Sequence, residues 1–423
     1  MIILALNCGS SSIKYMLYDS EKKIRITKGI VERIGIIGSF IRHEEPGKDV
    51  YEEKHDCQNH EVGLKLIVKT LTDRKIGVIK DLSEINAVGH RVVHGGEKFK
   101  KSMLITDEVL EGIRHVQDLA PLHNPHNISG ITAAMTLMPD IPHIAVFDTA
   151  FHQTMPPSAY LYPVPFEWYK MYGVRRYGFH GTSHLYVSRR AAVLLNKSPK
   201  EVNVITMHIG NGVSIAAVKG GESIDTSMGL TPLEGAVMGT RCGDIDPAIV
   251  LFMIEKEGYM AEEIDRILNK KAGLLGITGR YSDRRDIEAA AAKGDERSIL
   301  ANEIESFRLK KYIGSYIAAL GHVDAIVFTA GAGEMNAILR ERVLIGLEEL
   351  GIKLDKKLNE EAKSHDKESV ISSSDSKIKV FVVPTDEEIV FIEDVVAILE
   401  GRYDTHTHFT YSFDDPKYKK RRS

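Results

Sequence analysis

Residues 204–247 contain a glycine turn that could bind phosphate. An apolar run ends in His208-Ile209-Gly210-Asn211-Gly212 and resumes as VSIAAVK, a pattern that predicts two antiparallel strands joined by a tight turn. Glycine lets the backbone approach an anion closely, and such a turn leaves N–H groups available for phosphate oxygens. An ordinary hairpin uses the same residues, so a purely structural turn is an equal alternative for this stretch alone.

A second segment with the same pattern lies at the N-terminus. The apolar run from Ile2 to Leu6 is followed by Asn7-Cys8-Gly9-Ser10-Ser11-Ser12 and then by IKYMLYD, which alternates as a strand does. Asn7-x-Gly9 therefore corresponds to His208-x-Gly210. A repeat this long predicts two related domains, each with one phosphate-binding hairpin, although chance similarity of two short segments is the alternative.

Two arginines in glycine-containing segments and two acidic residues after predicted strands are further candidates for a catalytic site. Arg91 lies in GHRVVHGG and Arg241 in MGTRCGD, and a guanidinium in such a segment needs carboxylate or phosphate partners. Asp148 and Glu387 follow predicted strands, where active-site residues of α/β sheets gather. This combination favours phosphoryl transfer, which depends on positioning and charge neutralisation with Mg²⁺. Structural ion pairs for the arginines and a helix cap for Asp148 remain the alternatives.

Apolar periodicity predicts the elements that must position these residues. Helical spacing occurs at residues 61–72, 183–195, 246–257, 302–321, 337–350 and 389–401, and buried-strand patterns occur at 144–148, 324–329 and 380–383. The Pro- and aromatic-rich passage 155–168 is typical of a domain boundary. A serine-rich loop is expected at 369–378, and the segment after residue 400 is expected to be a poorly ordered tail with a solvated basic end.

Length and composition limit the class of protein. The 423 residues exceed the roughly 250–300 at which one core stops growing, so two domains are expected. The 43% hydrophobic and 27% charged residues are ordinary for a globular protein, and a formal charge of -4 gives no general attraction to nucleic acid or membranes. Three widely spaced cysteines, without a signal-peptide pattern, favour a reducing cytoplasmic location.

Together these segments resemble the acetate kinase family, within the actin-like and sugar-kinase-like superfamily. The resemblance is carried by residues 7–12 with Lys14, 89–96, 119–125, 147–156, 176–184, 208–214, 225–235, 238–247, GAGE at 331–334 and PTDEE at 384–388. It implies an α/β fold of two duplicated actin-like (ribonuclease H-like) domains with an active-site cleft between them. The first domain would comprise residues 1–150 and a closing helix at about 385–400, the second residues 151–384, and the tail 401–423 lies outside the resemblance.

The resemblance implies a reversible, Mg²⁺-dependent transfer of the γ-phosphoryl group of ATP to acetate, which gives acetyl phosphate and ADP. Mn²⁺ could replace Mg²⁺. On the matching positions, Arg91 and Arg241 would bind the carboxylate and stabilise the phosphoryl oxygens. Asp148 would orient the substrate or a metal-bound group, and His180 would donate to the phosphoryl group.

The same resemblance assigns the metal, the nucleotide and the acyl pocket. Asn7 and Glu387 would hold the metal directly or through water. Nucleotide binding would fall to Lys14, His208, Gly210, Asn211, Gly212, Asp283, Arg285, Gly331, Gly333, Glu334 and Asn336. The apolar pocket for the acid would be formed by Val93, Leu122, Phe179 and Pro232. A homodimer is expected because the family forms homodimers.

Several alternatives stay open at this point. Propionate or butyrate could replace acetate, because one methylene changes selectivity by only about 1–3 kcal/mol. An actin-type ATPase switch is an alternative from another class, but it has no use for two arginines directed at a small acid. His123, His152 and His184 could be structural or catalytic. Cys242 and Asp386 stand where relatives usually carry a small polar residue and an asparagine.

Overall fold

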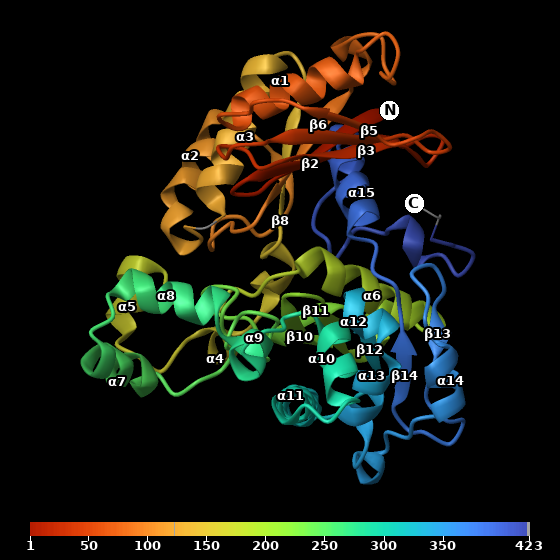
Figure 1. Ribbon diagram of the computed structural model, residues 1–423. Helices are drawn as coiled ribbons and strands as arrows, with labels where there is room; N and C mark the ends of the chain where they lie inside the picture. The colour runs from red at the N-terminus through yellow and green to blue at the C-terminus, as the bar shows by residue number, and fades with distance from the viewer. Residues whose placement is uncertain (122, 421–423) are drawn as a thin grey trace. The chain divides into compact units, whose positions relative to one another are not determined.

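The structure, a computed structural model, describes residues 1–121 and 123–420. The chain forms two compact units (Figure 1). Unit 1 contains residues 1–151 and 387–411, and unit 2 contains residues 152–386 and the described residues after 411. None of the helices in the described ranges combines the length and the apolar character that crossing a membrane requires.

Unit 1 is built on a mixed sheet with the strand order β5-β4-β3-β2-β1-β6-β8-β7. Its strands are β1 (Ile2–Cys8), β2 (Ser12–Asp19), β3 (Ile24–Glu32), β4 (Phe40–Glu44), β5 (Tyr51–Lys54), β6 (Ala87–Val92), β7 (Met103–Leu104) and β8 (His143–Phe147). The β1–β2 pair is antiparallel, and Cys8 lies opposite Ile13, so the predicted N-terminal hairpin is present. Strands β1, β6 and β8 run parallel, which brings their carboxyl ends to one edge of the sheet.

Helices cover both faces of this sheet because alternate strand residues are apolar on both sides. The helices are α1 (His60–Leu71), α2 (Asp107–His115), α3 (Asn124–Leu137) and α15 (Glu387–Leu399). Leu4 and Leu17 pack in one core with α1 and α3, whereas Ile3 and Met16 pack in another with α15. Gly89 permits the close approach of α15 to β6, since a Cβ there would lie 2.4 Å from the Phe391 ring.

Unit 2 repeats the central topology of unit 1 with the order β11-β10-β9-β12-β14-β13. Its strands are β9 (Asn203–Ile209), β10 (Val213–Lys219), β11 (Glu222–Thr226), β12 (Ala325–Thr329), β13 (Ser369–Val370) and β14 (Lys379–Val382). Strands β9, β10 and β11 are antiparallel neighbours, and β9, β12 and β14 run parallel, as β1, β6 and β8 do in unit 1. Ile209 lies opposite Val213, so the second predicted hairpin is also present.

The helices of unit 2 pack against this sheet and each other (Figure 1). They are α4 (Pro157–Tyr160), α5 (Phe166–Tyr172), α6 (Gly181–Leu194), α7 (Ala248–Glu257), α8 (Ala261–Lys270), α9 (Gly273–Thr278), α10 (Arg284–Ala291), α11 (Glu296–Leu320), α12 (Ala330–Met335), α13 (Ala337–Leu344) and α14 (Lys356–Glu361). Helix α6 packs on β9 and β12, and α11 packs on β10 and β9. Leu274, Ile287 and Ala301 form a buried cluster that joins α9, α10 and α11.

Two stretches differ from the sequence expectation. The helix predicted at 337–350 ends at Leu344, because Gly346 takes a left-handed backbone (φ 81°) that a continuous helix does not contain. The segment after residue 400 is not a solvated tail, because Phe409, Tyr411 and Phe413 are buried. The part of this segment up to Tyr411 belongs to unit 1, and the described residues after Tyr411 belong to unit 2.

Candidate active site

Arg91 and Asp148 meet at the carboxyl edge of the unit 1 sheet. Arg91 is on β6 and Asp148 directly follows β8. Their side chains form a two-pronged ion pair, in which Arg91 Nε donates to Asp148 Oδ1 at 2.9 Å and Nη2 donates to Oδ2 at 2.7 Å. Asp148 raises the pKa of Arg91 above its ordinary value, with a smaller contribution from Glu387. Asp148 is buried, while the Arg91 side chain is 32% exposed. The carboxylate therefore orients the guanidinium, and part of the Arg91 side chain remains accessible to a ligand.

The residues expected to hold a metal are few and oxygen-bearing. Asn7 is near the end of β1, and Glu387 begins α15; both side chains are half-buried. In the described part of the chain, no group of three or more His, Cys, Asp or Glu side chains is arranged to hold a metal ion. One amide oxygen and one carboxylate fit Mg²⁺, which takes one or two protein ligands with water and phosphate oxygens. Lys14 lies opposite Asn7 on β2 and is exposed.

The turn between β9 and β10 of unit 2 is the one expected to bind phosphate. Gly210 N donates to Gly212 O at 3.0 Å, which closes the turn, and Asn211 at its tip is exposed. His208 is the last buried polar residue before the turn. Its Nδ1 forms a hydrogen bond with Ser183 Oγ at 2.8 Å. Its ring stacks on that of His180 with centroids 4.1 Å apart.

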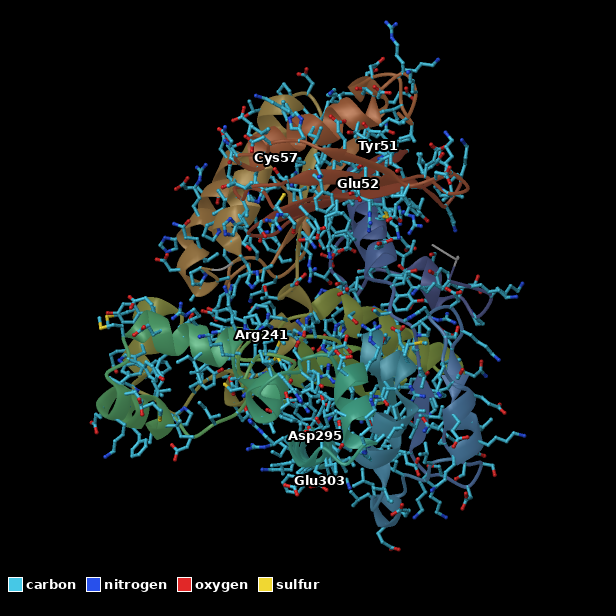
Figure 2. All side chains as sticks on the ribbon, viewed as in Figure 1. Tyr51, Glu52, Cys57, Arg241, Asp295 and Glu303 are labelled. Carbon is cyan, nitrogen blue, oxygen red and sulfur yellow. The ribbon has the colours of Figure 1, made fainter. Side chains whose placement is uncertain are left out.

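Gly212 brings His180 and Arg241 together. A Cβ at Gly212 would lie 3.3 Å from His180 Cε1 and 3.5 Å from Arg241 Nη1, so both side chains border the turn. His180 has a left-handed backbone (φ 57°) directly before α6, a conformation that is uncommon for a side chain other than glycine and is found at functional sites. Figure 2 labels Arg241 in the green part of unit 2. The structure therefore places three of the expected site residues at one turn.

Arg241 has the electrostatics of an anion-binding side chain. Its guanidinium donates to Pro232 O at 3.2 Å and approaches Met238 Sδ at 3.9 Å. Among the described residues no carboxylate contributes to the electrostatics of Arg241, and burial lowers its pKa below the ordinary value. A partly buried cation without a carboxylate partner is stabilised by an anionic ligand.

A buried hydroxyl network orients His180. Its Nδ1 lies 2.9 Å from Ser214 Oγ, which also lies 2.7 Å from His184 Nε2. His184 is fully buried, its Nδ1 lies 2.7 Å from Thr206 Oγ1, and burial lowers its pKa well below the ordinary value. His184 therefore holds Ser214, which in turn contacts His180. His152 is likewise fully buried, between Ser223 Oγ and Phe179 O.

Apart from Lys14, which is in unit 1, the expected nucleotide residues lie in unit 2 and have diverse local contacts. Gly331 on α12 faces open space, whereas Gly333 packs near Met207 O of β9. Glu334 is buried, accepts from Thr385 N at 3.1 Å and pairs with His365 Nδ1 at 2.7 Å. Two further side chains cap helices: Asn336 accepts from Leu339 N, and Asp283 accepts from Arg285 N. The side-chain bond from Arg285 lowers the pKa of Asp283 to about 2.

The expected pocket residues fall in both units. Val93 follows β6 in unit 1, and Phe179 and Pro232 are in unit 2, where Pro232 O contacts Arg241. Phe179 is buried and Val93 and Pro232 are partly exposed. Leu122, also expected to line the pocket, lies outside the described residues.

Comparison with known proteins identifies the family. The acetokinase family profile matches residues 2–393. An acetate kinase of Geobacter sulfurreducens is 63% identical over 413 residues, which cover 98% of each chain. The chain belongs to the acetokinase family. A crystal structure of Porphyromonas gingivalis acetate kinase has a TM-score of 0.90 at 47% identity and covers 94% of this chain and 99% of that one. A crystal structure of a Francisella tularensis propionate kinase has a TM-score of 0.85 at 41% identity and covers 93% of this chain and 98% of that one.

These matches confirm the predicted membership of the acetokinase family and its α/β fold of duplicated actin-like domains. The two residues that depart from the usual family pattern have local partners. Cys242 Sγ donates to Gly243 O at 3.2 Å, and burial raises the thiol pKa. Asp386 accepts from the hydroxyl of Tyr418, a residue beyond the region matched by the family profile.

Sequence reasoning missed several residues that support the acetokinase site. Arg284, a neighbour of the two expected residues Asp283 and Arg285, donates to Gly210 O at 2.7 Å and thereby fixes the β9–β10 turn. Ser214 and Thr385 belong to the networks around His180 and Glu334. The two adjacent arginines in SDRRD could have pointed to Arg284 in the sequence. Arg284 is the buried one of the two, and it is the one that contacts the turn.

Proposed function

We propose that the protein is an acetate kinase, which transfers the γ-phosphoryl group of ATP reversibly to acetate. The observation that carries the proposal is Arg241, a partly buried guanidinium without an acidic partner among the described residues, beside His180 and the β9–β10 turn. Such a group suits a charge that develops on phosphoryl oxygens during transfer. The high identity to acetate kinases supports acetate as the acceptor.

The remaining residues have roles that follow from their chemistry. Acetate is already ionised near neutral pH, so the attacking oxygen needs no general base. Arg91, held by Asp148, binds the carboxylate, while Arg241 neutralises the equatorial oxygens of the moving phosphoryl group. Ser214 fixes the His180 ring by its Nδ1, and the Nε2 edge, near Gly212, donates to the phosphoryl group.

Mg²⁺ neutralises the phosphate oxygens of ATP when it is bound. Asn7 and Glu387 would hold it, as their oxygen donors and partial exposure suit a hydrated ion. The turn that contains His208, Gly210, Asn211 and Gly212 binds the nucleotide phosphates, and residues 331–336 with Asp283 and Arg285 serve the adenosine side. The unpaired Cys8, Cys57 and Cys242 suit the reducing cytoplasm, where we propose the reaction occurs.

The direct test is acetyl phosphate formation from ATP, Mg²⁺ and acetate, trapped as the hydroxamate. We expect product in an amount equal to the ADP released, and no product when acetate or Mg²⁺ is omitted. Phosphate release at the same rate with and without acetate would instead support an ATPase switch and contradict the proposal.

The length of the acyl chain is set at Val93 under this proposal. We expect Val93→Ala to raise kcat/KM for propionate relative to acetate by about tenfold, because one methylene is worth about 1–3 kcal/mol in an apolar pocket. The similarity to a propionate kinase at 41% identity makes this ratio informative. The measurement is kcat/KM for acids of two to four carbons, with Val109→Ala on α2 as the control. An unchanged ratio would remove Val93 from the pocket.

We propose that two copies of the chain form a homodimer through the apolar surfaces of α5 and α7. Neither helix has a fully buried residue, and Trp168 (47%), Met171 (63%), Leu251 (64%) and Phe252 (56%) are exposed. Exposed aromatic and aliphatic side chains of this size are typical of subunit interfaces.

A charge placed on this surface is expected to separate the subunits. Phe252→Glu should shift the mass measured by light scattering toward the 47.1 kDa of one chain. The reason is that dimer formation would bury the new carboxylate in the interface without a partner. Ile37→Glu, at a 91% exposed position of unit 1, is the control and should leave the mass unchanged. A dimer that survives Phe252→Glu would place the interface elsewhere.

A further inference from the structure

The residues after Tyr411 form a segment attached to helix α6. Arg190 Nη1 donates to Phe413 O at 2.7 Å and to Asp415 O at 3.1 Å, and Arg189 pairs with Asp414 at 3.2 Å. The buried Phe413 ring packs on Tyr186 with centroids 4.8 Å apart. The segment is therefore fixed to the helix that begins directly after His180.

The far end of this segment reaches the two residues that precede Glu387. The Tyr418 hydroxyl donates to Asp386 Oδ2 at 3.4 Å, and Lys420 Nζ donates to Thr385 O at 2.6 Å. Both donors are partly buried, whereas the neighbouring Lys419 is exposed. Lys420 thus donates a hydrogen bond to the backbone of Thr385, whereas Lys419 is exposed.

Thr385 connects several parts of the proposed nucleotide site. Its N–H donates to Glu334 Oε1 at 3.1 Å, and its hydroxyl lies 2.9 Å from Ser183 Oγ. Ser183 Oγ in turn lies 2.8 Å from His208 Nδ1. A shift of Thr385 therefore alters contacts to α12 and to the residue that opens the phosphate turn.

We propose that residues 412–420 are a positioning element for Mg²⁺-nucleotide binding, in which Tyr418 and Lys420 hold Thr385 and Asp386 and so fix the approach of the chain to Glu387. The proposal rests on the nucleotide chemistry of the proposed function. It gives a role to Asp386, whose carboxylate accepts the hydrogen bond from Tyr418. The element lies beyond residue 393, where the match to the family profile ends.

The test is the affinity of the full-length protein for Mg²⁺-ADP, measured by calorimetry, in Lys420→Met. We expect the Kd to rise about tenfold, as loss of one charged hydrogen bond predicts. Lys419→Met, the same change at the exposed neighbouring residue, should leave the Kd unchanged. Lys420→Arg should restore most of the affinity because a guanidinium also donates to a carbonyl. Tyr418→Phe, which keeps the ring, should raise the Kd by a smaller factor.

Kinetics separate positioning from general stability. We expect the KM for acetate and the thermal midpoint of Lys420→Met to stay at the wild-type values while the KM for Mg²⁺-ATP rises. Equal losses in both substrates together with a lower midpoint would show a structural role only and overturn the proposal, as would an unchanged Kd for Mg²⁺-ADP. Failure of the wild type to form acetyl phosphate would reject the proposed function instead, and the calorimetric comparison would still test the segment.

Discussion

Arg241→Ala is expected to lower kcat for acetyl phosphate formation by on the order of 10³-fold or more, which corresponds to several kcal/mol of lost transition-state stabilisation. The guanidinium is partly buried, borders Gly212 and His180, and has no carboxylate partner among the described residues. Its removal therefore leaves no acidic group unpaired, and we expect the thermal midpoint to remain near that of the wild type. Loss of activity with retained stability is the specific expectation for a residue that neutralises the reaction's charge.

The measurement is the hydroxamate assay together with thermal unfolding. Arg241→Lys keeps the charge but not the planar fork, and we expect it to recover only a small part of the rate. Arg114→Ala, which removes a partly exposed guanidinium of unit 1, is the matched control and should keep wild-type kcat. If Arg241→Ala retained near-normal kcat, another cation would have to stabilise the phosphoryl oxygens.

Much of the fold was predictable because local sequence and tertiary structure agree. The β1–β2 and β9–β10 hairpins each combine a short polar, glycine-containing turn with flanking apolar strands, so their positions follow from turn chemistry and periodicity. Their relation as a repeat is expressed in the shared strand orders of the two sheets. Asp148 was predicted at a strand end, and it directly follows β8.

Element boundaries were less predictable where a cap or a distant contact decides them. Helix α11 was predicted from residue 302, but it begins at Glu296, because Asp295 (Figure 2) accepts a hydrogen bond from Ser298 N at 3.0 Å. The segment after residue 400 lies beyond the residues that the family profile matches, and its order depends on packing against α6 and α15 rather than on local propensity. Its aromatic residues were the one local sign that it is buried.

The candidate site shows the same division. Residue types near glycine turns identified Arg91, Arg241 and the residues around His208, because charge and backbone freedom are properties of the sequence itself. Which carboxylate an arginine meets is a property of the fold. Asp148 is 57 residues from Arg91, and Gly210 is 74 residues from Arg284. No spacing rule connects such pairs, so the partners that orient the site required the structure.

Arg284→Met is expected to destabilise unit 2 by roughly 3–5 kcal/mol, which lowers its thermal midpoint on the order of 10 °C. Arg284 Nε and Nη2 donate to Glu305 Oε1 at 2.8 and 2.5 Å, and the Glu305 side chain is 1% exposed. The substitution leaves this carboxylate buried without its cation. Calorimetric unfolding measures the effect, and Arg285→Met, at the exposed neighbour (90%), should change the midpoint little.

A second substitution separates the ion pair from the turn that it supports. Arg284→Met combined with Glu305→Gln removes the unpaired charge, so most of the lost stability should return. The bond from Arg284 Nη1 to Gly210 O is still absent in the double variant. Its affinity for Mg²⁺-ADP should therefore stay several-fold weaker than wild type, because Gly210 belongs to the turn proposed to hold the phosphates. Recovery of both stability and affinity would show that Arg284 serves the core alone. Recovery of stability without affinity would show that Arg284 couples its buried ion pair with Glu305, between α10 and α11, to the turn proposed to hold the phosphates.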